Sequence, residues 1–203
     1  MKTSTITASF VMASLLITGC ADKTQRIDMN QDKAGQVMGL DYRDFDEAAG
    51  KAIQSLLKSG ALDKKDGDRV VIAISNITND TMQHIDTDQL IKKIRVDLLR
   101  SGRAVITTSI GAEGNVDAMN KQVRELNESE DYNPRTTAPK GQLIAPEMSL
   151  SGKIIQRNIT MDDGKQQVEY YFQLTLTELK TGLAWWEDET VIGKRGSGKS
   201  VAW

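Results

Sequence analysis

The stretch "DRVVIAISNI", residues 68–77, contains an apolar run from Val70 to Ile74 that is typical of a buried strand. After a polar loop, residues 86–102 show the apolar spacing of a helix. The expected inner face of this helix is Leu90, Ile91, Ile94, Leu98 and Leu99. The run "RAVITTS", residues 103–109, predicts a second strand. Strand, helix and strand over this length indicate a βαβ unit with parallel strands and a right-handed crossover.

Two further helices are expected, one on each side of this unit. Residues 41–60 begin with Asp41 or Asp44 as a cap and end at Gly60. The buried face of that helix is expected to be Phe45, Ala49, Ile53, Leu56 and Leu57. Residues 115–130 form a more highly charged segment with weaker amphipathic spacing. Its expected inner face is Val116, Met119, Val123 and Leu126.

The last third of the chain changes to an alternating pattern. Turn signals at 162–164 and 180–182 divide residues 145–195 into three strands of an antiparallel meander. In the middle strand Tyr171, Gln173 and Thr175 alternate with apolar residues, so one sheet face packs and the other stays polar and open. The predicted fold class is therefore α/β (α+β), a βαβ unit followed by a meander. Together they give a mixed sheet of four to five strands with helices mainly on one face.

The N-terminus has the features of an export signal. Residues 1–19 contain Lys2 and an apolar stretch that is too short to span a bilayer, and they end directly before Cys20. Because Cys20 is the one cysteine of the sequence, it has no disulfide partner. The stretch "LITGC" resembles the lipobox of bacterial lipoproteins, which implies a lipid on Cys20. Ala21 follows, which by the same resemblance implies the periplasmic face of an outer membrane. We expect a tether over 20–40, a globular domain over 41–194 and a tail over 195–203.

Composition and motifs favour a binding protein without catalysis. A net charge of −2 and a pI near 5.5 argue against nucleic acid as a partner. The single histidine, His84, and the single cysteine argue against a metal site of His and Cys ligands and against a histidine-assisted serine nucleophile. "GKRGSGKS", residues 193–200, matches the phosphate-binding P-loop pattern, but three residues after Ser200 cannot form the required helix. We expect no enzymatic activity, cofactor, metal or nucleotide.

Four segments carry a resemblance to a known family. They are "DYRDFDEAAGKAIQSLL" (41–57), "VVIAISNITNDTMQHIDTDQLIKKIRVDLLRSGR" (70–103), "MSLSGKIIQR" (148–157) and "YYFQLTLTELKTGLAWWE" (170–187). They resemble the LpoB family, outer-membrane lipoprotein activators of penicillin-binding proteins. The resemblance implies a fold similar to the N-terminal domain of TolB, no catalysis, and stimulation of a class A synthase. Enterobacterial members have a long proline-rich linker, whereas the tether here reaches at most roughly 65 Å, at about 3.3 Å per residue.

The partner-binding residues are placed by a physical hypothesis. One group lies in the expected loop after the first strand, and another on the polar face of the meander. Alternation also sends one ring of the pair Trp185–Trp186 outward, where an exposed tryptophan is a frequent interface anchor, although packing against a loop is an equal alternative. The candidate residues are Asn76, Thr78, Asn79, Thr81, Tyr171, Gln173, Thr175 and Trp186.

An alternative function is a structural or secretion-related envelope lipoprotein that assembles with itself, as in pore lipoproteins related to CsgG. The sequence shows no extra pair of long alternating strands of the kind that membrane insertion requires. We therefore expect a monomer that binds a class A synthase.

Overall fold

The computed structural model describes residues 26–29, 37–112 and 114–197. The chain divides into two compact units, Met1–Asp32 and Lys33–Trp203. The described residues of the first unit, 26–29, are exposed. The predicted signal peptide, Cys20, most of the predicted tether and the last six residues lie outside the described residues. Within the described part, no helix has both the length and the apolar character that crossing a membrane requires.

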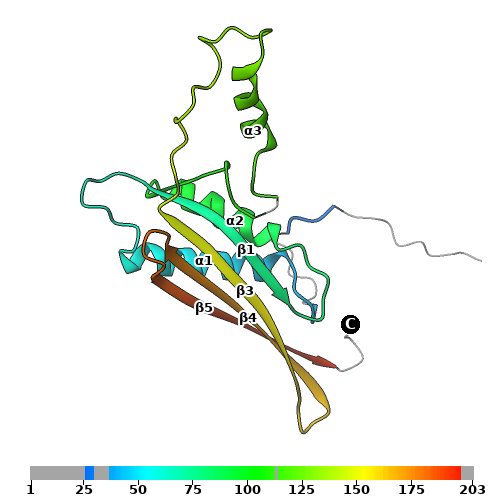
Figure 1. Cartoon of the computed structure of the whole chain (residues 1–203). Helices are drawn as coiled ribbons and strands as arrows, with labels where there is room; N and C mark the ends of the chain where they lie inside the picture. Colours follow the sequence, from blue (N-terminus) through cyan, green and yellow to red (C-terminus); the bar gives the residue numbers. More distant parts are fainter. Residues whose placement is uncertain (1–25, 30–36, 113, 198–203) are drawn as a thin grey trace, which may run out of the picture. The chain divides into compact units, whose positions relative to one another are not determined.

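The described residues of the second unit form a mixed five-stranded sheet and three α-helices, which confirms the predicted fold class (Figure 1). The strands lie in the order β2-β1-β3-β4-β5. β1 pairs in parallel with β2 and β3, while β4 is antiparallel to both β3 and β5. The elements are α1 (Tyr42–Ser59), β1 (Val70–Asp80), α2 (Asp88–Arg100), β2 (Ala104–Ile106), α3 (Ala118–Glu125), a 3-10 turn (Leu126–Glu128), β3 (Met148–Thr160), β4 (Lys165–Glu178) and β5 (Ala184–Ser197). The likeness to TolB stays a prediction.

Local signals set the ends of α1 as expected. The Asp41 side chain accepts hydrogen bonds from the backbone N–H groups of Arg43 and Asp44, and the Asp44 side chain accepts one from Asp41 N in return. This reciprocal capping box satisfies N–H groups that have no partner inside the helix. Gly60, with φ of 77°, ends the helix in the left-handed conformation that a glycine adopts without strain.

One face of the sheet carries the core. In β4 the residues Val168, Tyr170, Phe172, Leu174 and Leu176 are buried, as the alternation predicted. α1 and α2 cover this face, and Phe45 of α1 meets Phe172 edge to face, with ring centroids 6.0 Å apart (Figure 1). In α2 four of the five expected inner residues are buried, whereas Leu99 is 47% exposed, contrary to the prediction.

β1 is longer than the sequence indicated. Its pairing with β3 shifts by one residue between Ile74 and Ile77, because β1 contains a bulge there. On the other edge of β1, beyond the end of β2, the carbonyl of Ile74 accepts a hydrogen bond from Ala112 N at 2.9 Å. The prediction of a loop from Asn76 onward is therefore wrong, since the strand continues past the bulge to Asp80.

The predicted inner face of the third helix is also wrong. α3 has no buried residue, and Val116, Met119 and Val123 are exposed. The helix lies in the long connection between β2 and β3, and its apolar residues do not join the core. Periodicity reveals an apolar stripe but does not reveal whether another element covers it.

The packed domain extends beyond the predicted boundaries at both ends. Met38 is buried in the core, three residues before the expected start. At the other end β5 continues to Ser197, so residues 193–197 of the P-loop-like pattern pair with residues 165–169 of β4. These five residues form a strand, whereas a P-loop requires an open loop at that point.

Gly152 gives a test of the packing between β3 and β4. A Cβ atom at Gly152 would lie 2.5 Å from the carbonyl oxygen of Gln173, whereas one at Gly193 in β5 would meet nothing within 4 Å. We expect Gly152→Ala to lower the free energy of unfolding by about 1–3 kcal/mol through overpacking. Gly193→Ala, the matched control, should be neutral or slightly stabilising. The midpoints of urea unfolding, at unchanged m-value, measure the effect of each substitution on stability. Equal midpoints for the two variants would contradict the close contact between Gly152 and the Gln173 carbonyl.

Candidate partner-binding surface

The side of the sheet opposite the helices, which we call the open face, carries mostly polar side chains, with Ile155 and Val191 among them. Directly paired residues of neighbouring strands point to the same side of a sheet. The register therefore places Thr78, Lys153, Gln173 and Glu189 in one row across four strands. The next row contains Asp80, Ile155, Tyr171 and Val191. The open face consists of these eight residues with Ser151, Arg157, Glu169, Thr175 and Glu187.

The three predicted residues of β4 each donate a hydrogen bond to a carboxylate on this face. Gln173 donates to Glu189 at 2.8 Å, and Thr175 donates to Glu187 at 3.2 Å. The Tyr171 hydroxyl donates to Glu169 at 2.6 Å. These bonds hold the side chains in fixed positions, so that the face offers a preorganised pattern of polar groups.

The pair Tyr171–Glu169 also shifts the protonation of both groups. The hydrogen bond to Glu169 raises the pKa of Tyr171, because it stabilises the neutral phenol. The same bond, with a second from Gln167, lowers the pKa of Glu169 by stabilising its charged form. At neutral pH the phenol therefore remains a donor and the carboxylate remains charged.

The predicted residues of β1 divide between this face and the turn that follows the strand. Thr78 lies on the open face, in the same row as Gln173. Asn76 is exposed at the bulge. Asn79 accepts hydrogen bonds from the backbone and hydroxyl of Thr81 and donates to the carbonyl of Gln83. Asn79 and Thr81 therefore hold the turn after β1, a local role that the sequence analysis missed.

The tryptophan pair requires a correction. Trp186 is 7% exposed, and its indole N–H donates to the Ser55 hydroxyl of α1 at 3.3 Å. Trp185 is 53% exposed, at the point where the pairing of β5 with β4 shifts by one residue. Trp186 therefore packs in the core, contrary to the partner-binding role predicted for it, and Trp185 is the exposed ring of the pair.

Several residues of the open face were missed by sequence reasoning. Lys153 and Arg157 come from β3, and Lys153 forms an ion pair of 2.6 Å with Asp80 of β1. The alternation in "SGKIIQR" puts Lys153, Ile155 and Arg157 on the same side of a strand. That signal is present in the sequence, but the strand pairing is needed to place these residues beside Tyr171 and Gln173.

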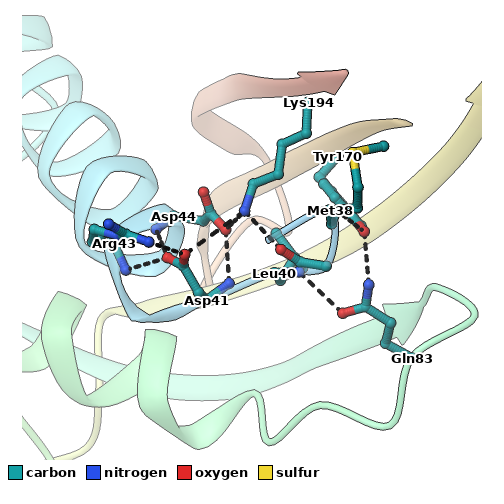
Figure 2. Close-up of polar contacts among 9 residues, drawn as sticks. Met38, Leu40, Asp41, Arg43, Asp44, Gln83, Tyr170 and Lys194 are labelled. Carbon is teal, nitrogen blue, oxygen red and sulfur yellow. Dashed lines mark hydrogen bonds and ion pairs between the residues drawn. The ribbon is translucent and has the colours of Figure 1, made fainter. Parts of the chain in front are cut away.

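On the opposite side of the sheet, a buried polar cluster joins the N-terminal segment to the domain (Figure 2). Lys194 of β5 donates to the carbonyl of Gly39 at 2.6 Å and to Asp44 at 2.5 Å. The side chains of Lys194 and Asp44 are only 9% and 10% exposed. We call this set the junction cluster; it consists of Met38, Gly39, Leu40, Asp41, Arg43, Asp44, Gln83, Tyr170 and Lys194.

The remaining contacts of the junction cluster link β4 and the turn after β1 to the same segment. The Tyr170 hydroxyl donates to the carbonyl of Met38 at 3.1 Å and accepts from Gln83 at 2.7 Å. Gln83 in turn accepts from Leu40 N at 3.1 Å. The segment that leads toward Cys20 is thus held by β4, by β5 and by the turn after β1 (Figure 2).

Burial and charge act in opposite directions on the two aspartates of the junction cluster. Burial raises the pKa of Asp44, and the hydrogen bond from Lys194 only partly offsets it. Burial also acts to raise the pKa of Asp41, but the hydrogen bond from Arg43 and the charge of Lys194 outweigh it and lower the pKa.

The described residues of this domain form an α+β fold with helices on one side of the sheet and the open face on the other. Residues 44–192 match the sequence model of the family described as peptidoglycan-synthase activator LpoB, and the chain belongs to this family. The resemblance predicted from the four segments is confirmed. The family regulates peptidoglycan synthases and is not itself catalytic.

Three solved structures illustrate the similarity. The C-terminal domain of LpoB from Escherichia coli is 11% identical, with a TM-score of 0.45, over 74% of this chain and 99% of that one. The corresponding domain from Salmonella enterica is 13% identical, with a TM-score of 0.40, over 75% and 98%. Lipoprotein GNA1162 from Neisseria meningitidis is 11% identical, with a TM-score of 0.39, over 64% and 90%. A comparison with curated protein sequences finds no match.

Removing the buried cation tests the junction cluster. Lys194→Met leaves Asp44 buried without its ion-pair partner, and we expect a loss of about 3 kcal/mol in the free energy of unfolding. Lys153→Met is the control, because its ion pair with Asp80 is 43% and 59% exposed and should contribute less than about 1 kcal/mol. Equal losses in urea unfolding would show that the Lys194–Asp44 pair is no more important than a surface pair.

The raised pKa of Tyr170 predicts that the stability of the domain decreases at alkaline pH. Burial raises the pKa of Tyr170 to about 12, although the hydrogen bond from Gln83 acts to lower it. An unfolded tyrosine loses its proton at about pH 10. The stability that Tyr170 contributes is therefore fully present below about pH 10 and is lost as the pH rises toward about 12. Between about pH 9 and pH 11 the urea midpoint should fall further for the unmodified chain than for Tyr170→Phe, and parallel falls would contradict the assignment.

Proposed function

We propose that this chain is a lipoprotein of the outer membrane that binds a class A penicillin-binding protein and stimulates its glycan polymerisation. The family match over residues 44–192 carries this proposal. In it, a lipid on Cys20 anchors the chain and the domain faces the periplasm. The role is regulatory, so the chain supplies binding energy and no catalytic group.

The layout of the open face supports its use as the binding surface. Its middle row places Ile155, Tyr171 and Val191 side by side, and rows with charged or polar side chains flank it. An apolar centre with a polar rim is the usual composition of a protein interface. Binding of this kind activates an enzyme when the partner's active conformation is bound more tightly than its inactive one.

The position of Met38 limits where the partner can lie. Because Met38 is fixed in the core, at most the residues from Cys20 to Val37 separate the proposed lipid from the domain. A chain of that length reaches at most roughly 60 Å, at about 3.3 Å per residue. The proposal therefore requires that the synthase extends its binding region to within about this distance of the outer membrane.

The test follows glycan-chain formation from lipid II by a purified class A synthase of the same organism, with the full chain in detergent. We expect a several-fold stimulation that Tyr171→Ala reduces, because loss of an interface anchor weakens binding by roughly tenfold. Lys51→Ala, on the exposed side of α1, is the matched control and should stimulate normally.

Two outcomes would contradict the proposal. Absence of both stimulation and binding with every class A synthase would reject the activator function. If light scattering then showed a closed ring of the chain, the self-assembling envelope lipoprotein would become the better interpretation.

A further inference from the structure

A second surface lies on the helical side of the domain, away from the open face. The first turns of α1 and α2 and the backbone around Gly114 enclose a groove of about 600 Å³, within the size range of small-ligand sites. Its lining includes Tyr42, Phe45, Asp88, Ile91, Lys92 and Asn115. We call it the helix groove.

One end of the helix groove is held by contacts between the two helices. Lys93 of α2 forms an ion pair with Asp46 of α1 and donates to the Tyr42 hydroxyl at 3.3 Å. Its ammonium also lies 5.3 Å from the centre of the Tyr42 ring. Lys93 therefore fixes the walls of the groove and is not free to bind a ligand.

Asn115 is the unusual residue of the groove lining. It is 6% exposed, and its side-chain oxygen accepts a hydrogen bond from Arg95 at 3.3 Å. This bond fixes the orientation of the amide, because the opposite orientation would place its N–H₂ group against the Arg95 guanidinium. Among the described residues, the Nδ2 atom of Asn115 has no acceptor. A buried donor without an acceptor is unfavourable, and a ligand carbonyl or carboxylate would relieve it.

Two charges of the groove also have no partner within the described residues. Asp88 and Lys92 lie four residues apart on α2, yet they do not form an ion pair, and the side chain of neither makes a hydrogen bond within the described domain. The Asp88 carboxylate lies against Gly114, where a Cβ atom would be only 2.7 Å from Oδ2. Glycine at this position leaves room for the carboxylate at the groove.

We propose that the helix groove binds a short peptide that carries a free ammonium group and a free carboxylate. In this arrangement Asp88 pairs with the ammonium, Lys92 pairs with the carboxylate, and Asn115 donates to a peptide carbonyl. Phe45 and Ile91 contact an apolar side chain between the two charged ends. A ligand with charge of only one sign would pair with either Asp88 or Lys92 and would repel the other or leave it unpaired. A zwitterion therefore fits this pair best.

The proposal is independent of synthase activation, because the groove and the open face share no residue. Zwitterionic peptides could come from the stems of peptidoglycan or from the ends of unrelated peptides. Ala-Leu-Ala with free termini represents the general chemistry. The tripeptide L-Ala-γ-D-Glu-meso-diaminopimelate represents the stem, and acetyl-Ala-Leu-Ala-amide is the uncharged control.

The experiment titrates these three peptides into the isotope-labelled full chain in detergent and follows the backbone amide signals of Gly114 and Asn115. We expect saturable shifts of these amide signals with the two charged peptides. The blocked peptide, acetyl-Ala-Leu-Ala-amide, should cause none. Asp88→Asn and Lys92→Gln should each weaken binding by roughly threefold or more, whereas Lys58→Gln, outside the groove, should not. Asn115→Asp keeps the acceptor for Arg95 and removes the donor, so it should fold normally and bind more weakly.

The comparison of the charged peptides identifies the source of the ligand. Tighter binding of the stem tripeptide indicates peptidoglycan, and equal binding indicates free peptide ends in general. Equal shifts with the blocked peptide, or no shift at millimolar concentration with folded chain, would overturn the proposal. Neither result bears on glycan polymerisation, so the two proposals fail separately.

Discussion

The sheet buries one of its faces and leaves the other open, and this constraint determines which residues each strand can place inward. β4 alternates strictly, so each residue that packs against α1 and α2 is followed by one that points away from them. β1 obeys the same constraint only because of its bulge. Without the extra residue, Ile77 would point to the open face and Thr78 to the core. The bulge keeps an apolar residue inside and returns a polar one to the surface.

The same constraint explains the buried ion pair at the edge of the sheet. Lys194 is an inward position of β5, yet it lies where the helix cover ends and the chain enters α1. An apolar side chain there would remove the donor to the carbonyl of Gly39 and leave the buried Asp44 carboxylate without its cation. A buried ion pair is seldom more stabilising than apolar packing, but it forms only when its two charged side chains lie next to each other. A slip of one residue in β5 would remove Lys194 from Asp44, so the pair selects one register of the edge strand.

Sequence reasoning succeeded where the signal is local and failed where it depends on pairing. The cap at Asp41, the stop at Gly60 and the alternation of Tyr171 and Phe172 each involve neighbours in the chain, and the structure has all of them. The choice between Trp185 and Trp186 depended on a bulge in β5, and the exposure of α3 depended on what the helix packs against. The junction cluster joins residues 150 positions apart, so no local pattern could reveal that Lys194 meets Asp44.

The helix groove and the open face are connected through the packed core and the sheet. Phe45 lines the helix groove and meets Phe172 edge to face, while Tyr171 next to it in β4 points to the open face. Proximity of this kind does not amount to coupling, which requires an element with two arrangements that each ligand favours differently. The described domain instead holds both surfaces on one hydrogen-bonded sheet and on the helix pair α1 and α2 packed against it. Any coupling that exists must be reciprocal, so a peptide in the groove that strengthened synthase binding would itself be bound more tightly in the complex.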